Sequence, residues 1–252
     1  LVKSRFHTAA RDLLMNVAKH LACGCLWLIT HLVQAESLIK PTAIDWLLDC
    51  TLPTDEQMAP EVLARTQCGV VTVPRNHAAP GEGTQRLYLT RVGAREPLSR
   101  EGVVFVQPGD TLQENSASTF SIHLASRWET YYTQAYRTLL NRYDVIELSP
   151  RELTQAHDVE QAVQDMEYVR AQLGDPRLHF LGNGHATRLG SRYAVQFPER
   201  VARMVLVNAE QGTADAFQVT HLRLREPAKP DGGGCISRWV GDFLALGKQP
   251  PP

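Results

Sequence analysis

The sequence predicts an α/β fold with a mainly parallel sheet that carries helices on both faces. Apolar runs of strand length alternate with amphipathic stretches of helix length along the chain, which is typical of parallel sheets whose strands are buried on both sides. Hydrophobic residues make up 43% of the 252 residues and charged residues 21%. This composition supplies enough apolar surface for a core and excludes a globally disordered chain.

The first predicted strands form a hairpin, because the runs around the turn-rich Pro80-Gly81-Glu82-Gly83 are apolar. A further strand lies between Gly102 and Pro108, and Gly174 and Pro176 end a helix. Helices are indicated by apolar residues at helical spacing. The strands are expected at Val70 to Val73, Arg86 to Val92, Val103 to Gln107, Val145 to Leu148, Leu178 to Leu181 and Met204 to Val207. The helices are expected at Ser118 to Leu140, Val159 to Leu173 and Leu189 to Phe197.

The charge balance excludes whole classes of function. The 26 basic and 27 acidic residues leave a net charge of −1, which does not favour electrostatic capture of nucleic acid or of an acidic membrane. The sequence has no glycine-rich phosphate loop, no His-Glu-x-x-His and no cluster of metal ligands. We therefore expect no cofactor, no metal site and no nucleic-acid partner.

The N-terminal stretch has the pattern of a secretory signal. Lys19 and His20 precede an apolar run from Leu21 to Ala35 that ends in a small residue. The run is shorter than the ~20 apolar residues that a stable membrane span needs. A buried helix is the alternative interpretation. With Met15 as the expected natural start, residues 1–35 are interpreted as an upstream extension and a signal peptide, and the protein as secreted or periplasmic.

Export makes the remaining cysteines candidates for oxidation. Cys50 and Cys68 flank a polar, proline-containing loop and are predicted to form a disulfide, which stabilises a fold by about 3 kcal/mol. Cys235 is left over and is expected to be a free thiol. Residues 36–210 are predicted to form the core, and residues 211–252 a lid remnant or tail.

Several motifs resemble those of secreted α/β-hydrolase-fold peptidases, the tripeptidyl aminopeptidase and proline iminopeptidase group. They are Asp45-Trp46 with Cys50, Cys68-Gly69-Val70 leading to Val73-Pro74, Thr187-Arg188-Leu189-Gly190, and Phe197-Pro198-Glu199-Arg200-Val201. The resemblance covers most of residues 45–210. It implies an α/β-hydrolase fold and a serine nucleophile at the centre of Gly-x-Ser-x-Gly, on a sharp turn between a strand and a helix.

The catalytic motifs that the resemblance implies are degenerate here. The aligned turn reads Gly182-Asn183-Gly184-His185-Ala186, so that Gly184 stands at the nucleophile position and Ala186 at that of the last glycine. The oxyanion loop reads Pro108-Gly109-Asp110, and a carboxylate at Asp110 opposes the stabilisation of an oxyanion. A third segment, expected as Asp-x-Arg-Gly-x-Gly, keeps only Arg151.

The triad acid and base of this fold follow the nucleophile on later strands. About 45 residues follow Val207, whereas the missing strands, helices and lid would need well over ~100 at the typical size of a βα unit, so the fold is predicted to be incomplete, without its last strands and most of its lid. His221 is the sole histidine in this stretch and is not favoured as a base. Met204 to Val207 would then be an exposed edge that allows self-association. Cys235 to Leu246 is predicted to be an amphipathic helix near that edge or on a partner, with a flexible tail as the alternative.

The sequence thus favours a non-catalytic member of this family, either a pseudoenzyme or a truncated product. One alternative is an active serine hydrolase or peptidase with an unrecognised nucleophile, such as Ser149 or Ser191. Another is a module that binds a peptide or a small acyl ligand in the remaining cleft, where the backbone amides of Gly184 and His185 would attract an anion at a helix N-terminus.

Overall fold

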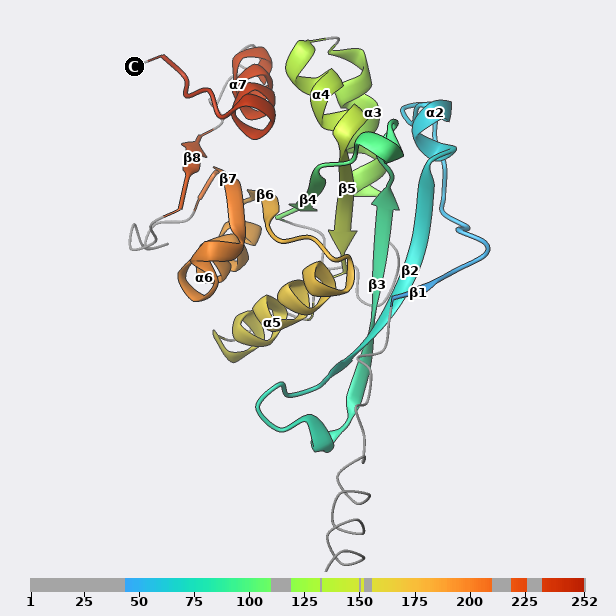
Figure 1. Ribbon diagram of the computed structural model, residues 1–252, viewed down its shortest axis with the longest axis vertical. Helices are drawn as coiled ribbons and strands as arrows, with labels where there is room; N and C mark the ends of the chain where they lie inside the picture. Colours follow the sequence, from blue (N-terminus) through green and yellow to red (C-terminus); the bar gives the residue numbers. More distant parts are fainter. Residues whose placement is uncertain are drawn as a thin grey trace, which may run out of the picture. The chain divides into compact units, whose positions relative to one another are not determined.

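Eight strands form one sheet in the part of the chain that the computed structural model describes, which comprises residues 44–109, 119–131, 133–149, 151, 156–209, 219–225 and 233–251. The strands are β1 (Asp45–Trp46), β2 (Thr66–Pro74), β3 (Thr84–Val92), β4 (Gly102–Gln107), β5 (Tyr143–Leu148), β6 (Leu178–Asn183), β7 (Val201–Val207) and β8 (His221–Leu224). Their order across the sheet is β1-β2-β3-β5-β4-β6-β7-β8 (Figure 1). The expected signal peptide in residues 1–35 and Asp110 lie outside the described residues.

The sheet has an antiparallel part and a parallel part. β2 and β3 form the predicted hairpin, and β1 and β5 pair antiparallel to its two strands. The pairs β5–β4, β4–β6, β6–β7 and β7–β8 are all parallel, in agreement with the mainly parallel sheet that the sequence predicts. Their carboxyl ends therefore meet at one edge of the sheet.

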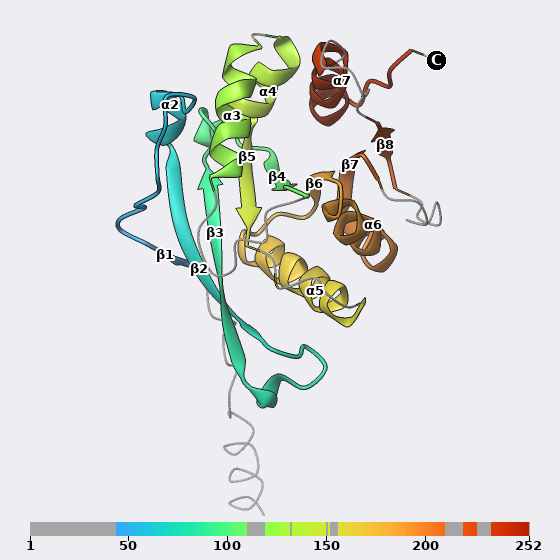
Figure 2. The same ribbon diagram turned by 180° about the vertical axis from the view of Figure 1, so that it is seen from behind.

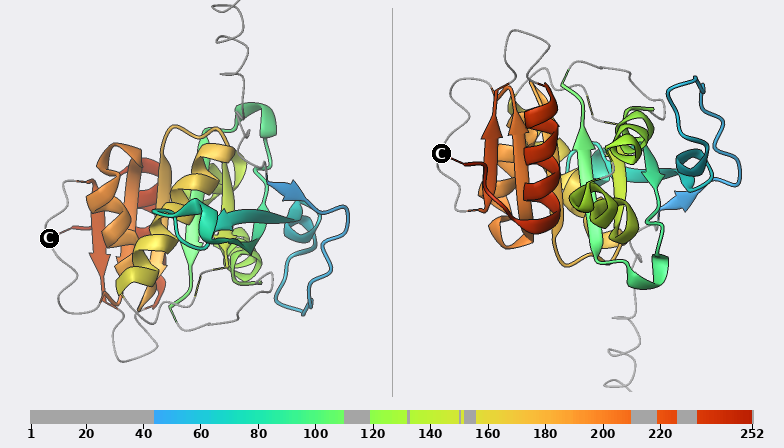
Figure 3. Two further views of the ribbon diagram at one scale, coloured as in Figure 1. Left: turned by 90° about the horizontal axis from the view of Figure 1, so that it is seen from below. Right: turned by 90° about the horizontal axis from the view of Figure 1, so that it is seen from above.

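Helices cover both faces of the parallel part (Figure 3). They are α2 (Pro60–Leu63), α3 (Phe120–Thr130), α4 (Gln134–Arg142), α5 (Ala156–Gln172), α6 (Ala186–Gln196) and α7 (Gly233–Leu246), with 3₁₀ turns at Pro80–Glu82, Pro97–Ser99 and Pro198–Arg200. α5 and α6 lie on one face, and α3, α4 and α7 lie on the other. The helix expected over Ser118 to Leu140 is two helices, because Thr133 caps a new one by accepting a hydrogen bond from Tyr136 N at 3.3 Å.

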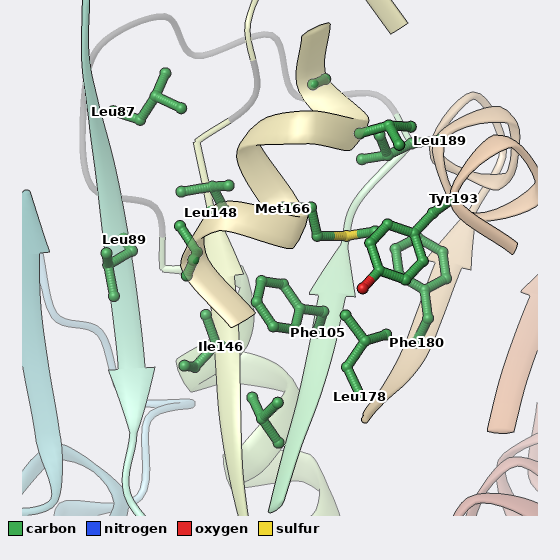
Figure 4. Packing of buried hydrophobic residues seen from close by; sticks show 14 of the residues in the cluster. Leu87, Leu89, Phe105, Ile146, Leu148, Met166, Leu178, Phe180, Leu189 and Tyr193 are labelled. Carbon is green, nitrogen blue, oxygen red and sulfur yellow. The ribbon is translucent and has the colours of Figure 1, made fainter. Parts of the chain in front are cut away.

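Two apolar clusters fill the space between sheet and helices. Phe105 of β4 and Phe180 of β6 pack with Met166 of α5 and Tyr193 of α6 (Figure 4). The second cluster lies beneath α3, α4 and α7 and includes Val104, Val106, Trp128, Leu139 and Phe243. Successive residues of β4 belong to different clusters because side chains alternate between the faces of a strand. This burial on both faces explains the continuous apolar runs in the sequence.

The expectation that β7 is an edge strand is wrong. β8 pairs with it in parallel register, from Met204 opposite His221 to Val207 opposite Leu224. Met204, Val205 and Leu206 are fully buried, so self-association through this strand has no exposed surface to use. β8 is not recognisable from the sequence because the strand is only four residues long and has an arginine between its two leucines.

α7 occupies the stretch where an amphipathic helix is expected. It packs on α4 and on β7 (Figure 2). Phe243 and Leu244 are fully buried in the second cluster. Gly241 allows the close approach to α4, since a Cβ there would lie 2.8 Å from the ring of Tyr136. α7 is thus part of the fold's core rather than a tail.

The predicted disulfide is confirmed. Cys50 and Cys68 are bonded, with their Cα atoms 5.1 Å apart, and they tie the segment before α2 to β2. Within the described residues, no helix is long and apolar enough to cross a membrane.

Candidate functional site

The sharp turn expected around Gly184 is present at the carboxyl edge of the sheet. β6 ends at Asn183, α6 begins at Ala186, and Gly184 lies at the turn with a φ of +53°. This left-handed backbone conformation costs a residue with a side chain about 1–2 kcal/mol, and glycine adopts it freely. The turn therefore keeps its backbone geometry without a nucleophilic side chain and without that strain.

Hydrogen bonds hold Gly184 on two sides. Its amide donates to the carbonyl of Val207 at the end of β7, at 3.0 Å. Its carbonyl accepts from Thr187 in the first turn of α6, from the amide at 3.0 Å and from the hydroxyl at 2.7 Å. The expectation that the Gly184 amide attracts an anion is therefore wrong, because this donor is already used within the fold.

Gly109 of the expected oxyanion loop lies directly against the turn. A Cβ at this position would overlap the carbonyl oxygen of Asn183 and lie 3.1 Å from the Cα of Gly184. The two glycines that the sequence analysis places in separate motifs are thus in backbone contact. Asp110, the next residue of that loop, lies outside the described residues.

Small residues surround the ring of Phe180 behind the turn. A Cβ on Gly182 would lie 2.6 Å from the Phe180 Cε1 atom, and a Cβ on Gly190 would overlap the same atom. Ala186, at the position of the last motif glycine, is buried with 5% exposure. Glycine at positions 182 and 190 therefore has a packing role that does not depend on catalysis.

His185 and His221 differ in their position relative to this turn. His185 is exposed at the start of α6. His221 begins β8, with its Nδ1 atom 2.9 Å from the carbonyl oxygen of Val219. Since each strand residue advances about 3.3 Å, His221 lies about 10 Å from the carboxyl end of its own strand. His221 thus lies away from the edge that carries Gly184.

The two alternative serines are buried within the fold. Ser149 is 5% exposed, and its hydroxyl accepts a hydrogen bond from the amide of Tyr88 at 2.8 Å, which extends the β3–β5 pairing. Ser191 is 7% exposed inside α6, and its Oγ atom has no hydrogen-bond partner among the described residues. Neither hydroxyl is presented at the turn.

Arg151, which remains from the third degenerate motif, has a structural partner. Its guanidinium donates to the buried carboxylate of Asp165 in α5 and to the carbonyl oxygens of Pro74 and Arg75. His77 also contacts Asp165, with 2.7 Å between Nε2 and Oδ1. Arg151 therefore connects the end of β2, at Pro74 and Arg75, to α5.

A pocket of about 160 Å³ opens beside the turn, and the sequence analysis missed it. It lies between the carboxyl ends of β4, β6 and β7 and the helices α3, α4 and α7. Its lining is Gln107, Phe120, Leu124, Arg127, Trp128, Tyr131, Tyr136, Leu181, Asn183, Val207, Ser237 and Val240. The aromatic spacing in α3 signals a buried helix face, but the convergence with Ser237 and Val240 depends on the packing of α7. Burial raises the pKa of Tyr136, so its hydroxyl stays protonated.

The described residues offer no group of three or more His, Cys, Asp or Glu side chains that could hold a metal ion. The polar side-chain groups of the described pocket lining are amides, hydroxyls and one guanidinium. Such an arrangement can bind a ligand by hydrogen bonds and charge.

Comparisons with known proteins agree with this fold. A sequence profile of the alpha/beta hydrolase fold matches residues 119–233. A serine protease of Mycobacterium tuberculosis is 44% identical over 55 residues, which is 22% of this chain and 11% of that protein. A tripeptidyl aminopeptidase of Streptomyces coelicolor is 23% identical over 192 residues, covering 56% of this chain and 34% of that protein. The chain thus spans about a third or less of the curated relatives it matches.

Solved structures include a lidless α/β serine hydrolase from Xanthomonas campestris, with a TM-score of 0.41 and 13% identity over 78% of this chain and 84% of that one. The chain has the α/β-hydrolase fold. Within it, the chain is related in sequence to aminopeptidases and serine proteases.

Proposed function

We propose that this chain is a non-catalytic α/β-hydrolase-fold protein that binds a ligand at the carboxyl edge of its sheet without cleaving it. The observation that carries the proposal is Gly184. The resemblance aligns Gly184 with the nucleophile, and the turn around it has a left-handed φ of +53° at Gly184 and has Gly109 packed against it. Acyl transfer through a covalent intermediate needs an attacking side chain, and glycine has none.

The hydrogen bonds of Gly184 support a structural role for the turn. They join the ends of β6 and β7 to the first turn of α6, so that the carboxyl edge stays ordered without a reaction to perform. In open α/β sheets this edge is where ligands bind. Binding at the edge therefore needs no nucleophile.

An active hydrolase that uses Ser149 or Ser191 is the alternative. Burial counts against both, since a substrate carbonyl must approach within about 3–3.5 Å of the attacking oxygen. The hydrogen bond from Tyr88 to Ser149 and the position of Ser191 inside α6 place both hydroxyls in the packed interior. Reaching either one would require the sheet or α6 to move.

Covalent labelling with a fluorophosphonate probe tests the proposal. We expect the purified chain to remain unlabelled and to release no product from a generic acyl ester or an aminoacyl arylamide. A serine peptidase in the same assay provides the positive control. Stoichiometric labelling would overturn the proposal, and the labelled peptide would identify the nucleophile.

The variant Gly184→Ser sharpens this test. We expect it to fold and to remain unlabelled, because a serine without an adjacent base is a weak nucleophile at its own pKa. Circular dichroism checks the fold. Labelling of this variant at position 184, and at no other residue, would mean that a functional base is present. The site would then be a catalytic site that lacks only its nucleophile.

We also propose that the chain is exported. The disulfide between Cys50 and Cys68 supports this, because such bonds persist in oxidising compartments. The test is non-reducing peptide mapping of protein taken from the medium or the periplasm, with Cys235 as an internal reference for a free thiol. Recovery of the protein only in the cytosol, with Cys50 and Cys68 reduced, would contradict export.

A further inference from the structure

The pocket between α3, α4 and α7 has rigid aromatic walls. The ring centroids of Trp128 and Tyr136 are 5.4 Å apart, and those of Tyr131 and Tyr136 are 5.3 Å apart. Trp128 and Tyr136 are each only 2% exposed. The contact of Gly241 with the Tyr136 ring fixes the distance between α4 and α7. These side chains cannot rearrange freely, so the walls are preformed.

Both tyrosine hydroxyls are directed to α7. The Tyr136 hydroxyl donates to the backbone carbonyl of Ser237, and the Tyr131 hydroxyl lies 3.0 Å from the Ser237 Oγ atom. Since these hydroxyls already have partners, the tyrosines offer the pocket mainly their ring surfaces. Phe120, Leu124, Leu181 and Val240 complete an apolar interior. Such walls are complementary to a flat aromatic group, which gains from offset or edge-to-face ring contacts.

One charge stands at this apolar interior. Arg127 of α3 is exposed and carries the only charged side chain among the described residues of the lining. Its guanidinium makes no hydrogen bond or ion pair with the described part of the chain. The amide of Gln107 donates to the carbonyl of Leu148 at 2.7 Å. Asn183 accepts through Oδ1 from Asn208, at 3.1 Å, which leaves its own Nδ2 hydrogens available. The Arg127 guanidinium and the Asn183 Nδ2 group are therefore donors that can bind an anion.

The volume limits the size of the ligand. A cavity of about 150 Å³ with apolar walls holds one benzene molecule. The pocket here is about 160 Å³, so it accommodates one six-membered ring, with any polar substituent at the open side. A single guanidinium balances one negative charge and matches a planar carboxylate through two parallel hydrogen bonds.

We propose that this pocket binds a monocarboxylate with a single aromatic ring, the ring packed against Trp128 and Tyr136 and the carboxylate on Arg127. The inference rests on the proposed binding role and adds the class of ligand. The ring replaces water against apolar walls, and the carboxylate pairs with the guanidinium of Arg127.

Calorimetric titration of the full chain with phenylacetate tests the assignment, with phenylacetamide as a neutral ligand of the same shape. We expect phenylacetate to bind at a single site, and the amide to bind about tenfold more weakly because it lacks the charge. Arg127→Gln should weaken phenylacetate binding about tenfold and leave the amide unchanged. Arg137→Gln, an exposed arginine of α4 outside the lining, is the matched control and should change neither.

Leu124→Trp should fill the pocket and abolish binding of both ligands. If that variant does not fold, the Arg127→Gln result carries the test alone, since this side chain is exposed. Absence of saturable phenylacetate binding, or equal affinity of the Arg127→Gln and wild-type proteins, would overturn the assignment while leaving the labelling result untouched. Conversely, hydrolysis of phenyl esters with intact phenylacetate binding would overturn the non-catalytic role and leave the pocket assignment standing.

Discussion

The two ends of the parallel strands differ in chemistry. At the amino ends, Arg100 donates through both Nη atoms to Asp175, at 2.7 and 2.6 Å, and through Nε to Asp144 at 2.7 Å. Both carboxylates are at least 97% buried. At the carboxyl ends, Gly109 and Gly184 are in backbone contact and the nearest pocket is mostly apolar.

Buried charge therefore does not mark the functional end of this sheet. The hydrogen bonds that Arg100 donates to Asp175 and Asp144 raise its pKa and keep it charged, and they join the starts of β4, β5 and β6. The carboxyl ends, where ligands of α/β sheets bind, bring Gly109 against the backbone of Asn183 and Gly184. The comparison predicts large effects on stability from changes at the amino ends and small effects at the carboxyl ends.

The largest effect is expected from Asp144→Ala. Asp144 accepts hydrogen bonds from Arg91, Arg100 and the amide of Ala94, and its loss leaves two arginines without this partner. Removing one member of a buried ion pair costs about 3–5 kcal/mol, so we expect the free energy of unfolding in urea to fall by about 4 kcal/mol.

Glu160→Ala provides the comparison for Asp144→Ala, because Glu160 pairs with Arg192 at the surface. We expect this change to cost less than about 1 kcal/mol. If both variants lost the same free energy of unfolding, the buried ion pairs at the amino ends would contribute no more to stability than an ordinary surface pair.

His179 at the amino end of β6 should make stability depend on pH. Burial lowers the pKa of His179 from 6.5 to about 4. The positive charges of Arg203 and Arg177 add to this effect, and the negative charge of Glu101 opposes it. Between these values the unfolded chain binds a proton that the folded chain does not, so stability falls as the pH drops from 6.5 towards 4. The full difference amounts to about 3 kcal/mol.

Urea unfolding at a series of pH values measures this dependence. His179→Leu should flatten the curve below pH 6.5, whereas the exposed His185→Gln should leave it unchanged. An unaltered slope in His179→Leu would assign the pH dependence to other groups.

Sequence patterns predicted what depends on local order along the chain. Long apolar runs identified β4 to β7, and the resemblance to secreted α/β-hydrolase-fold peptidases identified the turn at Gly184. Features that depend on distant contacts were missed. The side chains of α3 form a pocket only where α7 crosses α4, and the amide of Gly184 is occupied only because β7 ends beside it. β8 has too few apolar residues to be recognised without its pairing to β7.

Gly109→Ala should have an intermediate effect at the carboxyl end. Its Cβ would meet the backbone of Asn183, which cannot move without displacing the turn. Overpacking of this kind costs about 1–3 kcal/mol, and we expect a loss of about 2 kcal/mol in thermal or urea unfolding. Gly81→Ala is the matched control, since nothing lies within 4 Å of the added methyl group. A loss as small as that of the control would mean that the two glycine motifs are not packed together.

The smallest effect is expected at Gly184 itself. Gly184→Ala forces an alanine into a left-handed backbone conformation, and we expect the free energy of unfolding to fall by about 1 kcal/mol. Gly184→Asn should lower the free energy of unfolding by a smaller amount, because asparagine adopts this conformation more readily than alanine. If alanine and asparagine were equally well tolerated, the turn would not hold a positive φ at this position. A free energy of unfolding that falls in the order glycine, asparagine, alanine would instead show that the turn has hydrolase geometry. Glycine then removes the strain that a nucleophile would have there.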